Sequence, residues 1–150
     1  MKKKALIIYI SYSGNTKEVA ELIRDEIQDE YEVDMNRICG DYPPLKEEYL
    51  LYDIVIFGSF TWGKGEVPLD VKNTIAEIGV KHPFTYVFGT GDTQFGGDDL
   101  FCMAADKLAV FFNSPLYPLK IEQSPRGSQE KLVKEWSNLV KRSYKDIGGM

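Results

Sequence analysis

The chain has 150 residues, of which 43% are hydrophobic and 27% are charged, and this composition indicates one globular domain over residues 1–150. Its 18 basic and 23 acidic residues give a net charge of −5, which argues against a nucleic-acid-binding protein. No apolar run approaches the roughly 18 residues that a membrane span needs, and residues 5–10 form too short an apolar stretch for a signal peptide. We therefore expect a cytoplasmic protein that does not contact a membrane.

Compact apolar runs alternate along the chain with segments of helical period, which is typical of β-α-β units around a parallel sheet. Strands are expected at residues 5–10, 31–38, 53–60, 84–89 and 115–121. The first, third and fourth are apolar at nearly every position, as central strands covered on both faces should be. The second alternates and the fifth contains Pro118, so both are expected at the edges. The pattern predicts an α/β doubly wound, three-layer α/β/α sandwich with five parallel strands in the order 2-1-3-4-5.

Four helices are expected between and after these strands. The first has apolar positions between residues 19 and 27, and Asn15 and Glu18 would cap its start. The second begins near Pro68, and the third covers residues 101–112. Ser128 would cap the last helix.

The loops after the first, third and fourth strands should meet at one edge of the sheet, where doubly wound folds bind ligands. The first loop, "SYSGNT", has two serines and a threonine at a strand-to-helix turn, where backbone amides and the helix dipole favour an anion. It contains no lysine or arginine and matches neither the P-loop nor the dinucleotide fingerprint. Serine, glycine and asparagine also form ordinary turns, so this loop alone leaves that alternative open.

The second and third loops carry aromatic side chains among glycines. Trp62 follows a buried strand and precedes Gly63, and Phe95 lies within "GTGDTQFGGDD". A tryptophan there suits the face of a planar ring, although packing in the core or at an interface is the alternative. A phosphate at the first loop and a flat ring between two aromatics describe flavin mononucleotide (FMN).

These residues carry a family resemblance. The chain resembles the flavodoxins through "SYSGNT", "TWG", "FGTGDTQF" and "LKIEQSPRG", which occur in this order, and it lacks the insertion that splits the fifth strand of long-chain members. The resemblance implies a short-chain flavodoxin. Such a protein is a monomeric electron carrier rather than an enzyme. It holds FMN without a covalent bond and moves single electrons from a flavin or iron–sulfur reductase to acceptor proteins at low potential.

The resemblance also implies the roles of individual residues. Trp62 and Phe95 would flank the flavin ring, and the Gly63 carbonyl would accept the hydrogen that flavin N5 gains on one-electron reduction. Thr61 would help hold the phosphate or the ribityl chain. The phosphate would lie on Ser11, Tyr12, Ser13, Gly14, Asn15 and Thr16, and the third loop would contribute Thr90, Gly91, Asp92 and Gly96.

The second and third loops also depart from the usual flavodoxin pattern. Lys64 stands where relatives often have an acid, so we expect Lys64→Asp to lower the potential of the second electron. Phe95 replaces a common tyrosine and loses its hydroxyl. The carboxylates of Asp92, Asp98 and Asp99 would oppose further negative charge on the ring.

Three alternatives to a flavodoxin remain open. The long "FGGDDLFC" loop resembles that of the flavoproteins that activate manganese-dependent class Ib ribonucleotide reductase. An FMN-dependent NAD(P)H or quinone reductase would need an open flavin face. A flavin-free signalling domain would need an acidic cluster where Ser11 and Ser13 stand.

Cysteine and histidine give no sign of a metal or catalytic centre. Cys39 and Cys102 lack C-x-x-C spacing, so reduced structural thiols are expected, although one disulfide is formally possible. His82 lacks the companions that a metal site or a catalytic triad requires.

Overall fold

A computed structural model describes residues 2–11, 14–61, 66–91, 102–122 and 125–147. Within these ranges, five strands form one parallel sheet in the order β2-β1-β3-β4-β5. The strands are β1 (Lys3–Tyr9), β2 (Tyr31–Arg37), β3 (Ile54–Phe60), β4 (Thr85–Gly91) and β5 (Leu119–Glu122). The predicted α/β class, strand order and edge positions are therefore confirmed.

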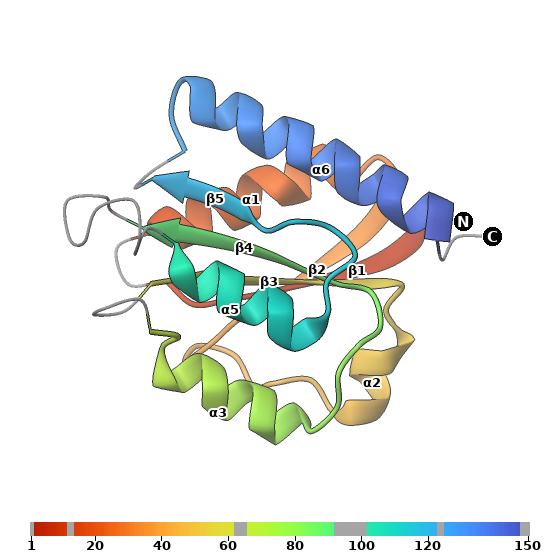
Figure 1. The fold of residues 1–150 in the computed structure, drawn as a ribbon. Coiled ribbons are helices and arrows are strands. Elements are labelled where there is room, and N and C mark those ends of the chain that lie inside the picture. The colour runs from red at the N-terminus through yellow and green to blue at the C-terminus, as the bar shows by residue number, and fades with distance from the viewer. Residues whose placement is uncertain (1, 12–13, 62–65, 92–101, 123–124, 148–150) are drawn as a thin grey trace.

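Helices cover both faces of the sheet. They are α1 (Asn15–Ile27), α2 (Lys46–Leu51), α3 (Leu69–Ile78), α5 (Met103–Phe112) and α6 (Ser128–Ile147). Figure 1 shows α1 and α6 on one face of the sheet and α3 and α5 on the other, which confirms the three-layer arrangement. The short helix α2 was not predicted from the sequence. Its Tyr49 is buried while Leu50 and Leu51 are exposed, so its six residues form no apolar stripe.

The side chains of the central strands enter two separate cores. In β1, Ala5, Ile7 and Tyr9 join the core beneath α1 and α6. The intervening Leu6 and Ile8 join the core beneath α3 and α5. Successive strand residues point to opposite faces, so a strand covered on both sides must be apolar throughout. This explains why the central strands read as continuous apolar runs.

Several boundaries differ from the expected ones. The fifth strand begins at Leu119 rather than at residue 115, directly after Pro118, whose nitrogen carries no proton for the ladder. Pro68 is the N-cap of α3 and so lies one residue before the helix. The expected cap Ser128 is already the first residue of α6.

Both cysteines are free thiols, as expected. Cys102 is fully buried at the N-cap of α5, and its burial raises the pKa of the thiol to about 12. Cys39 is exposed. Among the described residues, no three His, Cys, Asp or Glu side chains gather closely enough to hold a metal ion. In the same part of the chain, none of the helices is both long and apolar enough to cross a membrane.

Candidate functional site

The loops after β1, β3 and β4 start side by side at the carboxyl edge of the sheet. Beyond the last paired residues, the Ile10 amide donates to the Gly58 carbonyl at 3.1 Å, and the Thr61 amide donates to the Thr90 carbonyl at 3.2 Å. In Figure 1 the arrowheads of β4 and β5 point to this edge. The β1 and β3 strands are neighbours here although β2 lies between them in sequence, so this is the predicted switch point of the sheet.

The first loop makes its turn at Gly14, which has a φ of +94° and is the N-cap of α1. The buried Ser11 hydroxyl accepts the amide of Gly14 at 3.1 Å and that of Lys17 at 3.4 Å. The sequence-based expectation that Asn15 and Glu18 cap this helix is wrong, because the left-handed turn favours glycine and the Gly14 cap makes no side-chain hydrogen bond.

The same turn suits an anion. Asn15 and Thr16 are the first two helical residues, and the first amides of a helix have no partner within it. They lie at the positive end of the helix dipole. A Cβ added at Gly14 would meet no atom within 4 Å, so there is open space beside the turn. These observations fit the phosphate of a nucleotide.

Two buried hydroxyls join the first loop to β4. The Oγ1 atoms of Thr16 and Thr90 are 2.9 Å apart, and either can donate to the other. Whichever donates, the proton of the other hydroxyl remains available for an acceptor outside the pair. The structure thus brings together Thr16 of the first loop and Thr90 of the third, both of which were predicted to bind FMN.

Thr61 connects the second loop to α5. Its hydroxyl accepts the Ala104 amide in the first turn of α5 at 3.2 Å, an interaction that the sequence did not indicate. As an acceptor in this bond, the hydroxyl keeps its proton for a ligand. Gly91 is the last residue of β4, half-buried and paired in register with Glu122 of β5. Both residues lie at the expected edge of the sheet.

Arg37 brings a positive charge to the first loop, which contains no cation of its own. This last residue of β2 is paired with Tyr9 of β1, and its Nη2 donates to the Ser11 carbonyl at 3.4 Å. Sequence reasoning missed Arg37 because its place depends on the register between two parallel strands. One sequence signal could have found it. Arg37 ends the strand expected beside the first strand, and this places it close to the first loop.

The remaining assigned residues lie outside the described residues. They are Tyr12, Ser13, Trp62, Gly63, Lys64, Asp92, Phe95, Gly96, Asp98 and Asp99.

Comparison with known proteins agrees with the fold. The family model described as Flavodoxin matches residues 7–136. "Probable flavodoxin 2" of Bacillus subtilis is 32% identical over 136 residues, covering 85% of this chain and 87% of that protein. "Probable flavodoxin 1" of the same organism is 34% identical over 139 residues, covering 85% and 82%.

A solved structure extends the likeness to three dimensions. The crystal structure of oxidised Flavodoxin 2 from Bacillus cereus is similar to this chain with a TM-score of 0.77 and 31% identity, covering 93% of this chain and 98% of that one. The family model spans most of the chain, and the two Bacillus subtilis relatives are aligned over most of their lengths. This chain therefore belongs to the flavodoxin family.

Proposed function

We propose that this protein is a low-potential one-electron carrier that uses non-covalently bound FMN and passes electrons from a reductase to one or more acceptor proteins. Flavodoxins bind FMN without a covalent bond and are electron-transfer proteins rather than enzymes. The observation that carries the proposal is the joining of Ser11, Gly14, Thr16 and Thr90 at the switch point of the sheet.

The described residues fit the phosphate end of FMN. The first amides of α1 and the hydroxyls of Thr16 and Thr61 would donate to the phosphate oxygens. Ser11 would act indirectly, because its hydroxyl is occupied in holding the Gly14 and Lys17 amides. The Arg37 guanidinium, bound to the Ser11 carbonyl, would add an attractive charge close by.

The flavin end of the proposal rests on the family pattern. When bound, FMN supplies the capacity to accept and release single electrons. Trp62 and Phe95 would cover its ring and exclude water, and the Gly63 carbonyl would accept the hydrogen at N5. The carboxylates of Asp92, Asp98 and Asp99 would oppose added negative charge, which lowers the potential of the second electron.

We further propose that the carrier works as a monomer in the cytoplasm and has no reductase activity of its own. A reductive titration of the purified FMN-loaded protein, followed by absorption spectroscopy, tests the function. We expect two well-separated one-electron steps, the second at low potential. A single two-electron step, or two closely spaced steps, would contradict a flavodoxin-type carrier and favour the class Ib reductase activator or an enzyme.

The enzyme alternative has its own measurement. Steady oxidation of NADPH by the purified protein alone, without an added reductase, would establish a flavin reductase instead of a carrier. We expect no oxidation above that of free FMN at the same concentration.

A further inference from the structure

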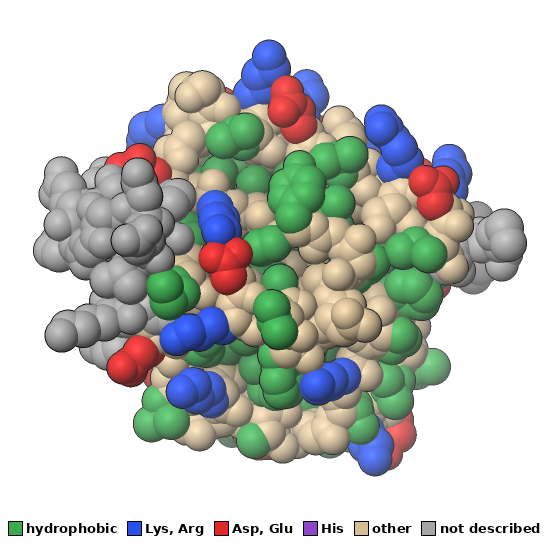
Figure 2. Space-filling model, viewed as in Figure 1, with side chains coloured by type: hydrophobic (Ala, Val, Ile, Leu, Met, Phe, Trp, Pro, Cys, Tyr) green, Lys and Arg blue, Asp and Glu red, His purple; other side chains and the backbone are tan. Residues whose placement is uncertain are grey.

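A groove of about 480 Å³ lies between α3 and α5, on the face of the sheet opposite α1 and α6. Its apolar lining consists of Val67, Ile75, Ala76, Leu108 and Phe111. Figure 2 shows hydrophobic surface with lysine or arginine side chains on either side of it over these two helices. The groove is separate from the carboxyl edge of the sheet to which the function is assigned.

Two lysines line the groove together with the apolar side chains. On α3, Lys72 lies three and four residues before Ile75 and Ala76, so all three share one stripe of the helix. On α5, Lys107 and Phe111 are likewise four residues apart. Each helix therefore presents both apolar surface and one positive charge to the groove.

A third lysine lies over the aromatic ring. The Nζ atom of Lys81 is 4.1 Å from the centroid of the Phe111 ring, in the geometry of a cation–π contact. Phe111 as a whole residue is nevertheless 44% exposed, so part of its surface remains open to a ligand.

The carboxylates of these helices are directed elsewhere. Asp70 and Glu77 of α3 lie two residues from Lys72 and Ile75 respectively, which places them on the far side of the helix. Asp106 of α5 is paired with Lys120 at 2.8 Å. No acidic side chain is among the described residues that line the groove. The groove is therefore positive although the whole chain has a net charge of −5.

The size of the groove and its charge indicate the occupant. Its volume lies within the roughly 300 to 1,000 Å³ of small-molecule sites. A second copy docked symmetrically would place Lys72 and Lys107 against the same lysines of its partner, which is unfavourable. We propose that this groove binds a monomeric amphiphilic carboxylate, with its apolar body between α3 and α5 and its carboxylate among the lysines.

An NMR titration of the FMN-loaded protein with decanoate below its micelle concentration tests the proposal. We expect saturable shifts of backbone amides in α3 and α5, including Ile75 and Phe111, with α6 unaffected. Decyltrimethylammonium, which has the same chain length and a positive head, should bind at least about fivefold more weakly, the factor for one exposed charge contact near 4 Å. These chemical shifts do not depend on electron transfer. If decanoate does not bind, the inference about the groove fails and the proposed electron-carrier function is unaffected.

Charge variants locate the site. Lys72→Gln and Lys107→Gln should each raise the dissociation constant of decanoate about fivefold. Lys134→Gln, on α6 at the opposite face of the sheet, is the matched control and should leave it unchanged. These exposed positions are far from the core, so the variants should fold normally.

Three results would overturn the inference. They are shifts that do not saturate or that spread over the whole protein, equal binding of the cationic amphiphile, and equal affinity of all three lysine variants. Shifts of the same amides on raising the protein concentration without decanoate would instead show that a second copy covers the groove. Shifts with anionic phospholipid vesicles but not with decanoate would assign it to a membrane surface.

Discussion

At the scale of single residues, the hydroxyl pair of Thr16 and Thr90 joins the start of α1 to β4 across 74 positions of sequence. We expect Thr90→Val to raise the dissociation constant of FMN about fivefold. The substitution keeps the side-chain shape but removes the hydrogen bond, worth about 1 kcal/mol, that orients the Thr16 hydroxyl for the phosphate. Quenching of FMN fluorescence on titration with the apoprotein measures the constant.

The control for this variant is Thr74→Val. The Thr74 hydroxyl donates to the Asp70 carbonyl at 2.9 Å within α3, outside the site. Thr74→Val should lower the stability of the protein, because it removes this hydrogen bond, and it should leave the dissociation constant of FMN unchanged. Equal effects of the two variants on FMN binding would remove Thr90 from the phosphate site.

His82 is a buried structural group and not a catalytic one. Its Nδ1 accepts the Phe84 amide at 3.0 Å, so its proton is on Nε2, which donates to the Tyr52 carbonyl at 2.6 Å. Only the neutral ring can make both bonds. Burial lowers the pKa of His82, against the smaller opposing effects of the Tyr52 carbonyl and the Asp53 charge.

This geometry predicts an acid-sensitive stability. Because the folded-state pKa lies below the unfolded value of about 6.5, the contribution of His82 is complete above pH 6.5 and is lost as the pH falls through that value toward the folded pKa. His82→Gln should cost about 1 to 3 kcal/mol at pH 7.5 and progressively less toward pH 5. Urea unfolding of both proteins across this range measures the difference, and parallel pH profiles would contradict the assignment.

At the scale of elements, Gly58 allows β3 and β4 to pack around an aromatic ring. A Cβ added at Gly58 would lie 2.0 Å from the Cζ atom of Phe88, which is fully buried in β4. Gly58→Ala should therefore lower the free energy of unfolding by about 1 to 3 kcal/mol, the usual cost of overpacking a core. Gly40→Ala is the control, because its Cβ would meet only the flexible side chain of Arg37 at 3.3 Å.

Thermal and urea unfolding of the two glycine variants measure this effect. If Gly58→Ala were as stable as the parent protein, the Phe88 ring would have to move without loss of packing, and the close approach seen here would not be a constraint.

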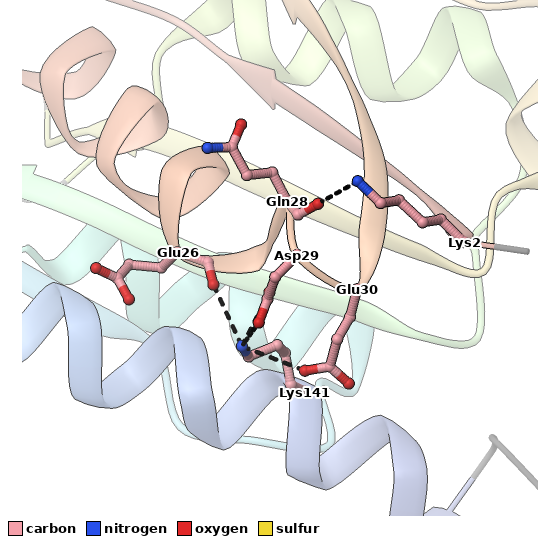
Figure 3. A network of polar contacts seen from close by, with 6 residues as sticks. All are labelled: Lys2, Glu26, Gln28, Asp29, Glu30 and Lys141. Carbon is pink, nitrogen blue, oxygen red and sulfur yellow. Dashed lines mark hydrogen bonds and ion pairs between the residues drawn. The ribbon is translucent and has the colours of Figure 1, made fainter.

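At the scale of the whole molecule, Lys141 of α6 joins the C-terminal helix to the turn between α1 and β2. Figure 3 shows its Nζ atom directed at Asp29, Glu30 and the Glu26 carbonyl. The distances to the two carboxylates and to the carbonyl are each 3.2 Å. The Lys141 side chain is 13% exposed, but the side chains of Asp29 and Glu30 are 67% and 38% exposed, so salt should weaken these ion pairs.

We expect Lys141→Met to reduce the free energy of unfolding by about 1 kcal/mol, because it keeps the packing of the stem but removes the charged hydrogen bonds. Lys145→Met, at an exposed position one turn later, should change it by less than about 0.5 kcal/mol. Urea unfolding at low and high salt measures both variants. Equal losses from the two would show that the network contributes nothing.

The sequence by itself determined the parallel α/β class and the strand order, and it predicted the loop that would hold a phosphate. These follow from local patterns, since strands covered on both faces must be apolar throughout and a strand-to-helix turn exposes amides. The short α2 left no such pattern, because only Tyr49 of its six residues is buried.

Only the tertiary structure decided which of these groups meet. The pairing of Thr16 with Thr90, the bond from Ala104 to Thr61 and the approach of Arg37 to Ser11 each join different loops or strands. The lysine-lined groove likewise needs α3 and α5 side by side. Such contacts depend on strand register and helix packing, which join residues distant in sequence and leave no periodic signal within either segment.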